Sequence, residues 1–176
     1  MLTDAVNRKD FAIKTERLML VPIRAEHAEA YFEAFTPEVA RYQFPEPFQS
    51  AGAARAFILE AQAFRAQGEE LVLAILDMDG AFLGSAEARN LTSPTPEVGL
   101  WLKSAAQGRG YGKEAMAALL SFLRENGSVD FFVYEADRRN GASTRLAIAL
   151  GGECQCAYDV EGAGGKLLRL KLYYIT

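Results

Sequence analysis

The 176-residue chain contains two cysteines, Cys154 and Cys156, and a single histidine, His27. Two cysteines at this spacing are too few for a disulfide framework or a zinc site. On a strand both side chains would share one face, and we expect reduced residues that pack in the interior. We expect His27 to be a solvated residue on the polar side of a helix rather than a catalytic base. Metal chemistry is therefore not predicted.

The sequence also lacks a run of about 18 or more apolar residues, which excludes a predicted transmembrane helix. Its first fourteen residues, MLTDAVNRKDFAIK, lack the apolar stretch of a signal peptide. A cytoplasmic location without membrane contact is the expectation. The net charge of −4 does not suggest a nucleic-acid partner.

Half of the residues are hydrophobic and 24% are charged, which is typical of a globular chain. We expect residues 1–14 to form a flexible N-terminal arm and residues 15–176 to form one domain. Hydrophobic periodicity and turn signals predict the order β α α β β β α β α β β, an α/β fold with a mixed sheet. The expected elements are strands 17–23, 70–76, 81–90, 97–102, 129–135, 153–160 and 166–174 and helices 25–35, 50–67, 111–126 and 140–150.

A glycine-rich loop, Gln107-Gly108-Arg109-Gly110-Tyr111-Gly112, joins strand 97–102 to helix 111–126. The first N–H groups of a helix have no intrahelical acceptors and carry partial positive charge, so they bind anions such as phosphate. The glycines allow close backbone approach, and Arg109 and Lys113 add positive charge. The alternative is a flexible turn, but the flanking strand and helix favour an anion site.

Two other phosphate-binding loops are excluded by spacing. A P-loop requires Ser or Thr after Gly-Lys, whereas Glu114 follows Gly112-Lys113. The dinucleotide fingerprint requires a glycine where this chain has Lys113.

From about Thr15 to the C-terminus, the chain resembles the GNAT acetyltransferase superfamily. Its coenzyme A loop has Gln or Arg, two residues, Gly, one residue, and Gly or Ala at a helix start, as residues 107–112 have here. Asn140-Gly141-Ala142-Ser143 resembles the family's Asn, two residues, Ser or Ala, before a short helix. EVGLWL at 97–102 is similar to the strand before the loop in the ribosomal-protein N-terminal acetyltransferase branch.

The resemblance implies a GNAT-like, mostly antiparallel twisted sheet flanked by helices, with acetyl-CoA as co-substrate. The loop would hold the pyrophosphate, the strand would pair with the pantetheine arm, and Asn140 and Ser143 would line its far side. A bulge at Gly99 would open the strand. The implied coenzyme-binding residues are Leu100, Trp101, Leu102, Gln107, Gly108, Arg109, Gly110, Tyr111, Gly112, Lys113, Asn140 and Ser143.

For catalysis, Glu97 is the first candidate for the base that deprotonates the amine, through a water molecule, and Glu87 is the second. A backbone N–H near Leu100 is the expected oxyanion donor. Many relatives have a tyrosine acid seven residues after the asparagine, where this chain has Ala147. Ser143 can take that role, or the thiolate can leave with help from solvent.

The predicted function is an N-acetyltransferase that moves an acetyl group to a protein N-terminus or a small amine. One alternative is a non-catalytic acyl-CoA-binding or sensing module on the same fold, and another is a phosphate-loop nucleotide binder. The connector 41–48 is predicted either to wall the acceptor pocket or to be a rigid loop packed on the core. A monomer and a homodimer both stay open.

Overall fold

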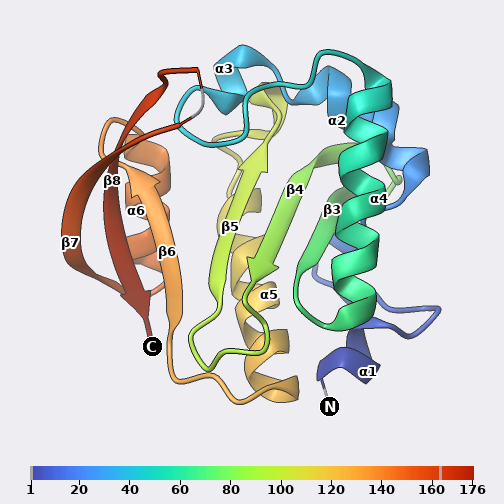
Figure 1. Cartoon of the computed structure of the whole chain (residues 1–176). Helices are drawn as coiled ribbons and strands as arrows, with labels where there is room; N and C mark the ends of the chain where they lie inside the picture. The colour runs from blue at the N-terminus through green and yellow to red at the C-terminus, as the bar shows by residue number, and fades with distance from the viewer. Residues whose placement is uncertain (1, 163) are drawn as a thin grey trace.

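The computed structural model describes residues 2–162 and 164–176, so Met1 and Ala163, which fall in the expected arm and in the turn of the last hairpin, lie outside it. An eight-stranded sheet has the order β1-β2-β3-β4-β5-β6-β8-β7 and carries helices on both faces (Figure 1). The strands are β1 (Ile13–Lys14), β2 (Leu18–Pro22), β3 (Leu71–Asp77), β4 (Phe82–Arg89), β5 (Glu97–Leu102), β6 (Phe132–Asp137), β7 (Gly152–Glu161) and β8 (Leu167–Ile175). The helices are α1 (Leu2–Val6), α2 (Ala28–Ala34), α3 (Pro37–Ala40), α4 (Ala51–Gln67), α5 (Tyr111–Asn126) and α6 (Gly141–Ala149), with 3-10 turns η1 (Ala25–His27) and η2 (Ser104–Ala106).

The strands pair antiparallel except at the centre of the sheet, where β5 and β6 run parallel. This confirms the predicted mixed, mostly antiparallel sheet. Strands β5 and β6 pair only at Glu97 with Val133 and at Val98 with Tyr134. Beyond Val98 the two strands diverge, as the yellow-green β5 and the orange β6 show in Figure 1. The sheet is therefore split in its middle.

Two hydrophobic clusters cover the two faces of the sheet. On one face, helix α5 buries the predicted stripe of Ala115, Met116, Leu119, Leu120 and Leu123 against the strands. On the other face, helices α2 and α4 cover an aromatic cluster that includes Tyr31, Phe35, Phe82 and Trp101. Burial of this apolar surface holds both helical layers on the sheet.

Residues 2–14 differ from the flexible arm that we expected. They form α1 and β1, which bury Val6, Phe11 and Ile13 in the larger cluster, and Ile13 pairs with Leu20. Three apolar residues spread over eight positions are too sparse to give a periodic pattern, although each of them reaches the core.

Three smaller expectations were wrong. His27 is not solvated: its side chain is 12% exposed and its Nδ1 accepts a hydrogen bond of 3.0 Å from the Arg24 amide. Cys154 and Cys156 are exposed rather than packed, because β7 is an edge strand and its register shifts between them. No bulge occurs at Gly99, since the pairing of β4 with β5 continues without a break from Gly84 to Arg89.

Candidate active site

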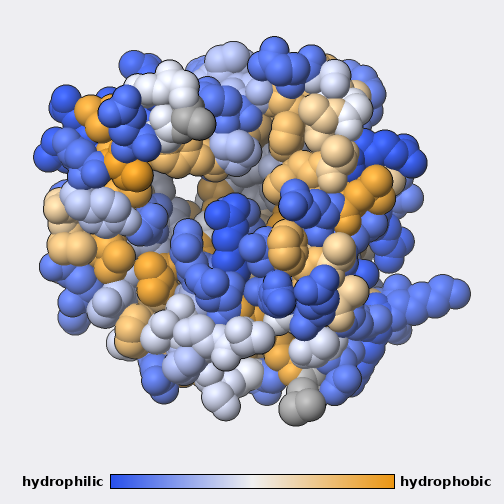
Figure 2. Space-filling model, viewed as in Figure 1, coloured by the Kyte–Doolittle hydropathy of each residue, from blue (hydrophilic) through white to orange (hydrophobic). Residues whose placement is uncertain are grey.

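A pocket of about 440 Å³ lies where β5 and β6 diverge. Leu100, Trp101 and Leu102 of β5 line it, as the sequence predicts for a strand beside a ligand. Figure 2 shows that the surface is hollowed at this place. Because the lining includes residues from both faces of the sheet, the pocket connects the side of α5 and α6 to the side of α2 and α3.

The glycine-rich loop closes one side of this pocket. Gln107, Gly108, Gly112 and Lys113 line it, and the Gln107 side chain donates a hydrogen bond of 2.9 Å to the Leu102 carbonyl. Gly108 and Gly110 have φ angles of 72° and 81°, in the region that favours glycine. The first hydrogen bond into α5 runs from the Glu114 amide to the Gly110 carbonyl. Within residues 2–162 and 164–176, the amides of residues 109–113 have no hydrogen-bond acceptor, as an anion site requires.

Three of the predicted coenzyme ligands, Arg109, Gly110 and Tyr111, do not line the pocket. The guanidinium of Arg17 lies over the Tyr111 ring at 4.7 Å and donates a hydrogen bond of 3.0 Å to the Arg109 carbonyl. Arg17 also forms an ion pair of 2.6 Å with Glu114. Arg17 thus fixes the outer side of the loop, a role that sequence reasoning missed because 92 positions separate Arg17 from Arg109.

On the same side, Asn140 caps α6 as predicted, because its side-chain oxygen accepts a hydrogen bond of 3.2 Å from the Ser143 amide. Asn140 and Ser143 both line the pocket. The Ser143 hydroxyl lies 2.9 Å from the hydroxyl of Tyr134, which comes from β6 and was not predicted. Burial raises the pKa of Tyr134 above its ordinary value. Ala147, at the position of the family's tyrosine, is fully buried.

The opposite side of the pocket carries the two candidate bases. Glu87 forms an ion pair of 3.0 Å with Arg89, whereas the Glu97 carboxylate accepts no hydrogen bond in the part of the chain that the structure describes. Burial raises the pKa of Glu97, the charge of Glu135 raises it further, and Arg89 opposes the shift. Because its carboxylate is unpaired and has a raised pKa, Glu97 suits a general base better than Glu87 does.

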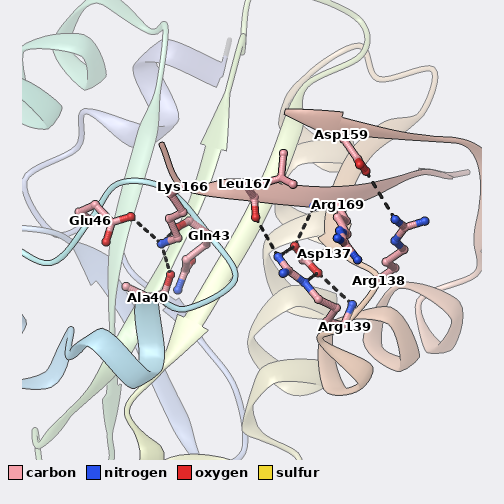
Figure 3. Close-up of polar contacts among 10 residues, drawn as sticks. All are labelled: Ala40, Gln43, Glu46, Asp137, Arg138, Arg139, Asp159, Lys166, Leu167 and Arg169. Carbon is pink, nitrogen blue, oxygen red and sulfur yellow. Dashed lines mark hydrogen bonds and ion pairs between the residues drawn. The ribbon is translucent and has the colours of Figure 1, made fainter. Parts of the chain in front are cut away.

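Residues 41–48, which we call the strap, cross this side of the pocket. Tyr42, Gln43 and Phe44 line the pocket, which is where the predicted acceptor wall would lie. The Lys166 amino group donates hydrogen bonds of 2.7 Å to the carbonyls of Ala40 and Gln43 and forms an ion pair of 2.9 Å with Glu46 (Figure 3). The strap is therefore tied to the start of β8.

A second polar cluster fixes the turn between β6 and α6. The Asp137 carboxylate, in a residue that is 1% exposed, accepts hydrogen bonds of 2.8 and 2.7 Å from the Arg139 guanidinium and one of 2.8 Å from the Arg169 amide (Figure 3). Burial would raise the pKa of Asp137, but these donors outweigh it and lower the pKa to about 2. The cluster holds the turn that delivers Asn140 to the pocket.

Comparison with known proteins identifies the family of this chain. The family model described as "Acetyltransferase (GNAT) domain" matches residues 17–153, so the chain belongs to the GNAT acetyltransferase family. Members of this family use acetyl-CoA, and the chain is an acetyltransferase by family. No curated protein sequence matches the chain.

Solved structures with the same fold include two ribosomal-protein acetyltransferases and Mycobacterium smegmatis RimJ. RimL, a ribosomal L7/L12 alpha-N-protein acetyltransferase in complex with coenzyme A, has a TM-score of 0.85 at 17% identity, covering 93% of this chain and 97% of that chain. The Salmonella typhimurium acetyl transferase that modifies the N-terminal serine of L7/L12 has a TM-score of 0.79 at 16% identity, covering 93% and 98%. Mycobacterium smegmatis RimJ, in complex with a CoA-disulfide, has a TM-score of 0.79 at 19% identity, covering 90% and 81%.

In residues 2–162 and 164–176 we find no helix long and apolar enough to cross a membrane. The same residues contain no group of three or more His, Cys, Asp or Glu side chains placed to hold a metal ion.

Proposed function

We propose that the chain transfers the acetyl group of acetyl-CoA to the primary amine of a peptide N-terminus or of a small molecule, by direct attack on the thioester. One observation carries the proposal: the gap between β5 and β6 connects the unpaired amides of the glycine-rich loop to the unpaired carboxylate of Glu97. Acetyl-CoA bound along this gap would have its phosphates at the loop and its acyl carbon near Glu97. Holding the two reactants together in this way lowers the activation free energy by several kcal/mol, up to about 7–11 kcal/mol in ideal cases.

The residues present fit the donor. Gly112 and Lys113 line the pocket, so their unpaired amides and the Lys113 ammonium provide hydrogen bonds and positive charge for a diphosphate. The free edge of β5 beyond Val98 offers backbone groups to an amide-rich arm, as a strand edge does to a peptide. Asn140 and Ser143 line the other side of the same channel.

The chemistry then divides between the two sides of the pocket. Glu97 takes the proton of the attacking amine, directly or through a water molecule. A backbone N–H near Leu100 donates to the oxyanion of the tetrahedral intermediate, and Ser143 donates to the departing sulfur. A neutral amine releases one proton and the thiol gains one, so the net charge of the reacting groups is conserved. An acceptor that arrives as an ammonium ion first gives up one further proton to solvent.

The acceptor side carries three carboxylates, Glu87, Glu97 and Glu135, and one cation, Arg89. This excess of negative charge favours an acceptor that arrives as an ammonium ion. Support for a peptide N-terminus comes from the ribosomal-protein acetyltransferases that share the fold, and the charge argument supports small amines equally.

The test mixes the protein with acetyl-CoA and a panel of peptide N-termini and small amines, and measures release of free thiol. We expect release above the uncatalysed rate with at least one acceptor, and loss of most of that rate in Glu97→Gln. Tight coenzyme A binding by calorimetry, with thiol release unchanged from background and unaffected by Glu97→Gln, would instead support the non-catalytic binding module that the alanine at position 147 suggests.

A further inference from the structure

Tyr134 and Ser143 form a hydroxyl pair at the wall of the pocket, in which Tyr134 is buried and Ser143 is half-buried. The two oxygens lie 2.9 Å apart, Tyr134 is 2% exposed, and both residues line the pocket. Ser143 is the one hydrogen-bond partner that the Tyr134 hydroxyl has within the described residues. The pair therefore links β6 to the first turn of α6 at the coenzyme side of the gap.

The direction of this hydrogen bond follows from counting donors and acceptors. Each hydroxyl has one proton to donate and lone pairs to accept with. If Ser143 donated to Tyr134, the buried proton of Tyr134 would have no acceptor, which is costly. We take Tyr134 as the donor to Ser143, because this arrangement satisfies the more buried of the two hydroxyls, and the Ser143 proton is then free to point into the pocket.

We propose that Tyr134 is a positioning residue, which holds the Ser143 hydroxyl so that its proton points at the sulfur of the bound thioester. The inference rests on the proposed function. During transfer the C–N bond forms, the C–S bond breaks, and the electron pair of the C–S bond stays on sulfur. Ser143 stabilises this thiolate by a hydrogen bond, and neither Ser143 nor Tyr134 loses its proton. The amine proton leaves through Glu97, and the thiolate takes a proton from solvent.

A simpler role for Tyr134 is to fill the core, with Ser143 merely satisfying its hydroxyl. The two roles differ in how their effects combine. If Tyr134 acts through Ser143, its hydroxyl has no effect once the serine hydroxyl is gone. If it only packs, the two substitutions act independently and their effects multiply.

The test needs no acceptor. Coenzyme A is bound to the protein, and the ionisation of its thiol is followed by the ultraviolet absorbance of the thiolate. The reference is an unperturbed thiol, whose pKa is about 8.5. The proteins compared are the wild type, Ser143→Ala, Tyr134→Phe, the double variant and Ser143→Thr, which keeps a hydroxyl. The control is Tyr173→Phe, because Tyr173 is buried beside Tyr134 on β8 and its hydroxyl makes no hydrogen bond in the described part of the chain. Lys113 and Asp137 also line the pocket, and every protein retains them.

Relative to the wild type, we expect the acidity constant of the coenzyme thiol to fall about tenfold in Ser143→Ala and about threefold in Tyr134→Phe. The double variant should show the same fall of about tenfold as Ser143→Ala alone. Ser143→Thr should lose less than Ser143→Ala because it keeps a hydroxyl, and Tyr173→Phe should match the wild type. With an acceptor present, Tyr134→Phe should lower kcat about threefold without raising the KM for acetyl-CoA.

The failures are distinguishable. If coenzyme A does not bind to the wild type, the proposed function fails and this inference fails with it. If coenzyme A binds but Tyr134→Phe titrates like the wild type, or the double variant shows the product of the two single effects, the inference alone is overturned. Thermal melts identify any variant that is unfolded, and if Ser143→Ala is unfolded, Ser143→Gly, which also lacks the hydroxyl, replaces it.

Discussion

The amino group of Lys166 donates a hydrogen bond of 2.7 Å to the carbonyl oxygen of Gln43, which precedes it by 123 positions. This contact joins the start of the last hairpin strand to the strap, and Gln43 itself lines the pocket. Three polar partners share one ammonium whose side chain is 18% exposed. The wall on the acceptor side of the pocket therefore depends on a residue outside the pocket lining.

Replacing Lys166 with Met keeps the aliphatic stem and removes these three interactions. We expect the strap to loosen, so that the KM for the acceptor rises about fivefold while the Kd of coenzyme A stays within about twofold. Steady-state kinetics with both substrates and calorimetry with coenzyme A provide the two numbers. Lys171→Met is the matched control, because Lys171 lies on β8, just after Lys166 in the chain, and pairs with Ala136 rather than with the strap. A rise in the coenzyme Kd equal to the rise in acceptor KM would contradict this assignment.

Glu97→Gln tests the base. Burial, and then the charge of Glu135, raises the pKa of Glu97, so the wild-type rate should increase with pH as this carboxyl ionises. In Glu97→Gln we expect kcat/KM to fall about 100-fold. The rise of the rate with pH, which is the acid limb of the pH profile, should disappear. In Glu87→Gln the limb should remain, because Glu87 is paired with Arg89. A profile of Glu97→Gln that keeps the wild-type limb would exclude Glu97 as the base.

The same substitution has an opposite effect on stability. A folded-state pKa above the unfolded one means that Glu97 stabilises the fold when protonated, and this contribution is lost as the pH rises through the raised pKa. At neutral pH the ionised, half-buried carboxylate costs stability. We therefore expect Glu97→Gln to melt at the same temperature as the wild type or higher at pH 7, measured by circular dichroism. A lower Tm would indicate that the carboxylate has a structural partner.

The central part of this fold was predictable from the sequence because its signals are local. Strand 97–102 and helix 111–126 were predicted with the bounds that the structure has, since a short apolar run marks the strand and helical periodicity between Gly110 and Gly127 marks the helix. The Asn140 cap was predictable for the same reason. Short elements such as α1 and α3 carry too few residues for a period to appear.

The site was only partly predictable because its supporting contacts are between distant residues. The sequence gives no sign that Arg17 holds the loop at Arg109, or that Tyr134 faces Ser143. Alternation along residues 132–137 could have shown that Tyr134 and Ala136 share the buried face with Phe132, but not which helix meets that face. Long-range partners of this kind require the topology of the sheet.

Lys113→Ala and Arg109→Ala separate the two cations of the loop. Lys113 lines the pocket, whereas the Arg109 guanidinium lies 5.2 Å from the centre of the Tyr111 ring, outside the pocket lining. We expect Lys113→Ala to raise the Kd of coenzyme A about fivefold at low salt, with a smaller effect at high salt because screening weakens the lost attraction. Arg109→Ala should change the Kd less than about twofold. Calorimetry at two ionic strengths measures both, and a larger effect of Arg109→Ala would support the ligand role predicted from the sequence.

Asp137→Asn tests whether the buried cluster beside the pocket stabilises the fold. Burial opposes ionisation of Asp137, but hydrogen bonds from Arg139 and Arg169 lower its pKa to about 2. A folded-state pKa below the unfolded value near 3.9 means that this contribution is complete above about pH 4 and is lost as the pH falls toward 2. Asparagine keeps one acceptor oxygen and places an N–H group opposite the donors. We therefore expect Asp137→Asn to lower the free energy of unfolding at pH 7 by about 2 to 3 kcal/mol.

Chemical denaturation of Asp137→Asn and of the wild type at several pH values between about 2 and 7 measures this difference. The difference in the free energy of unfolding between the two proteins should be largest above about pH 4 and should become smaller as the pH falls. Protonation of Asp137 removes its charge from the wild type, as the substitution does at neutral pH. Asp159→Asn is the control: its carboxylate is half exposed and lies 3.7 Å from the Arg138 guanidinium, so its removal should change stability by less than about 1 kcal/mol. Equal losses from the two substitutions, or a difference independent of pH, would show that the Asp137 charge does not stabilise the turn that carries Asn140.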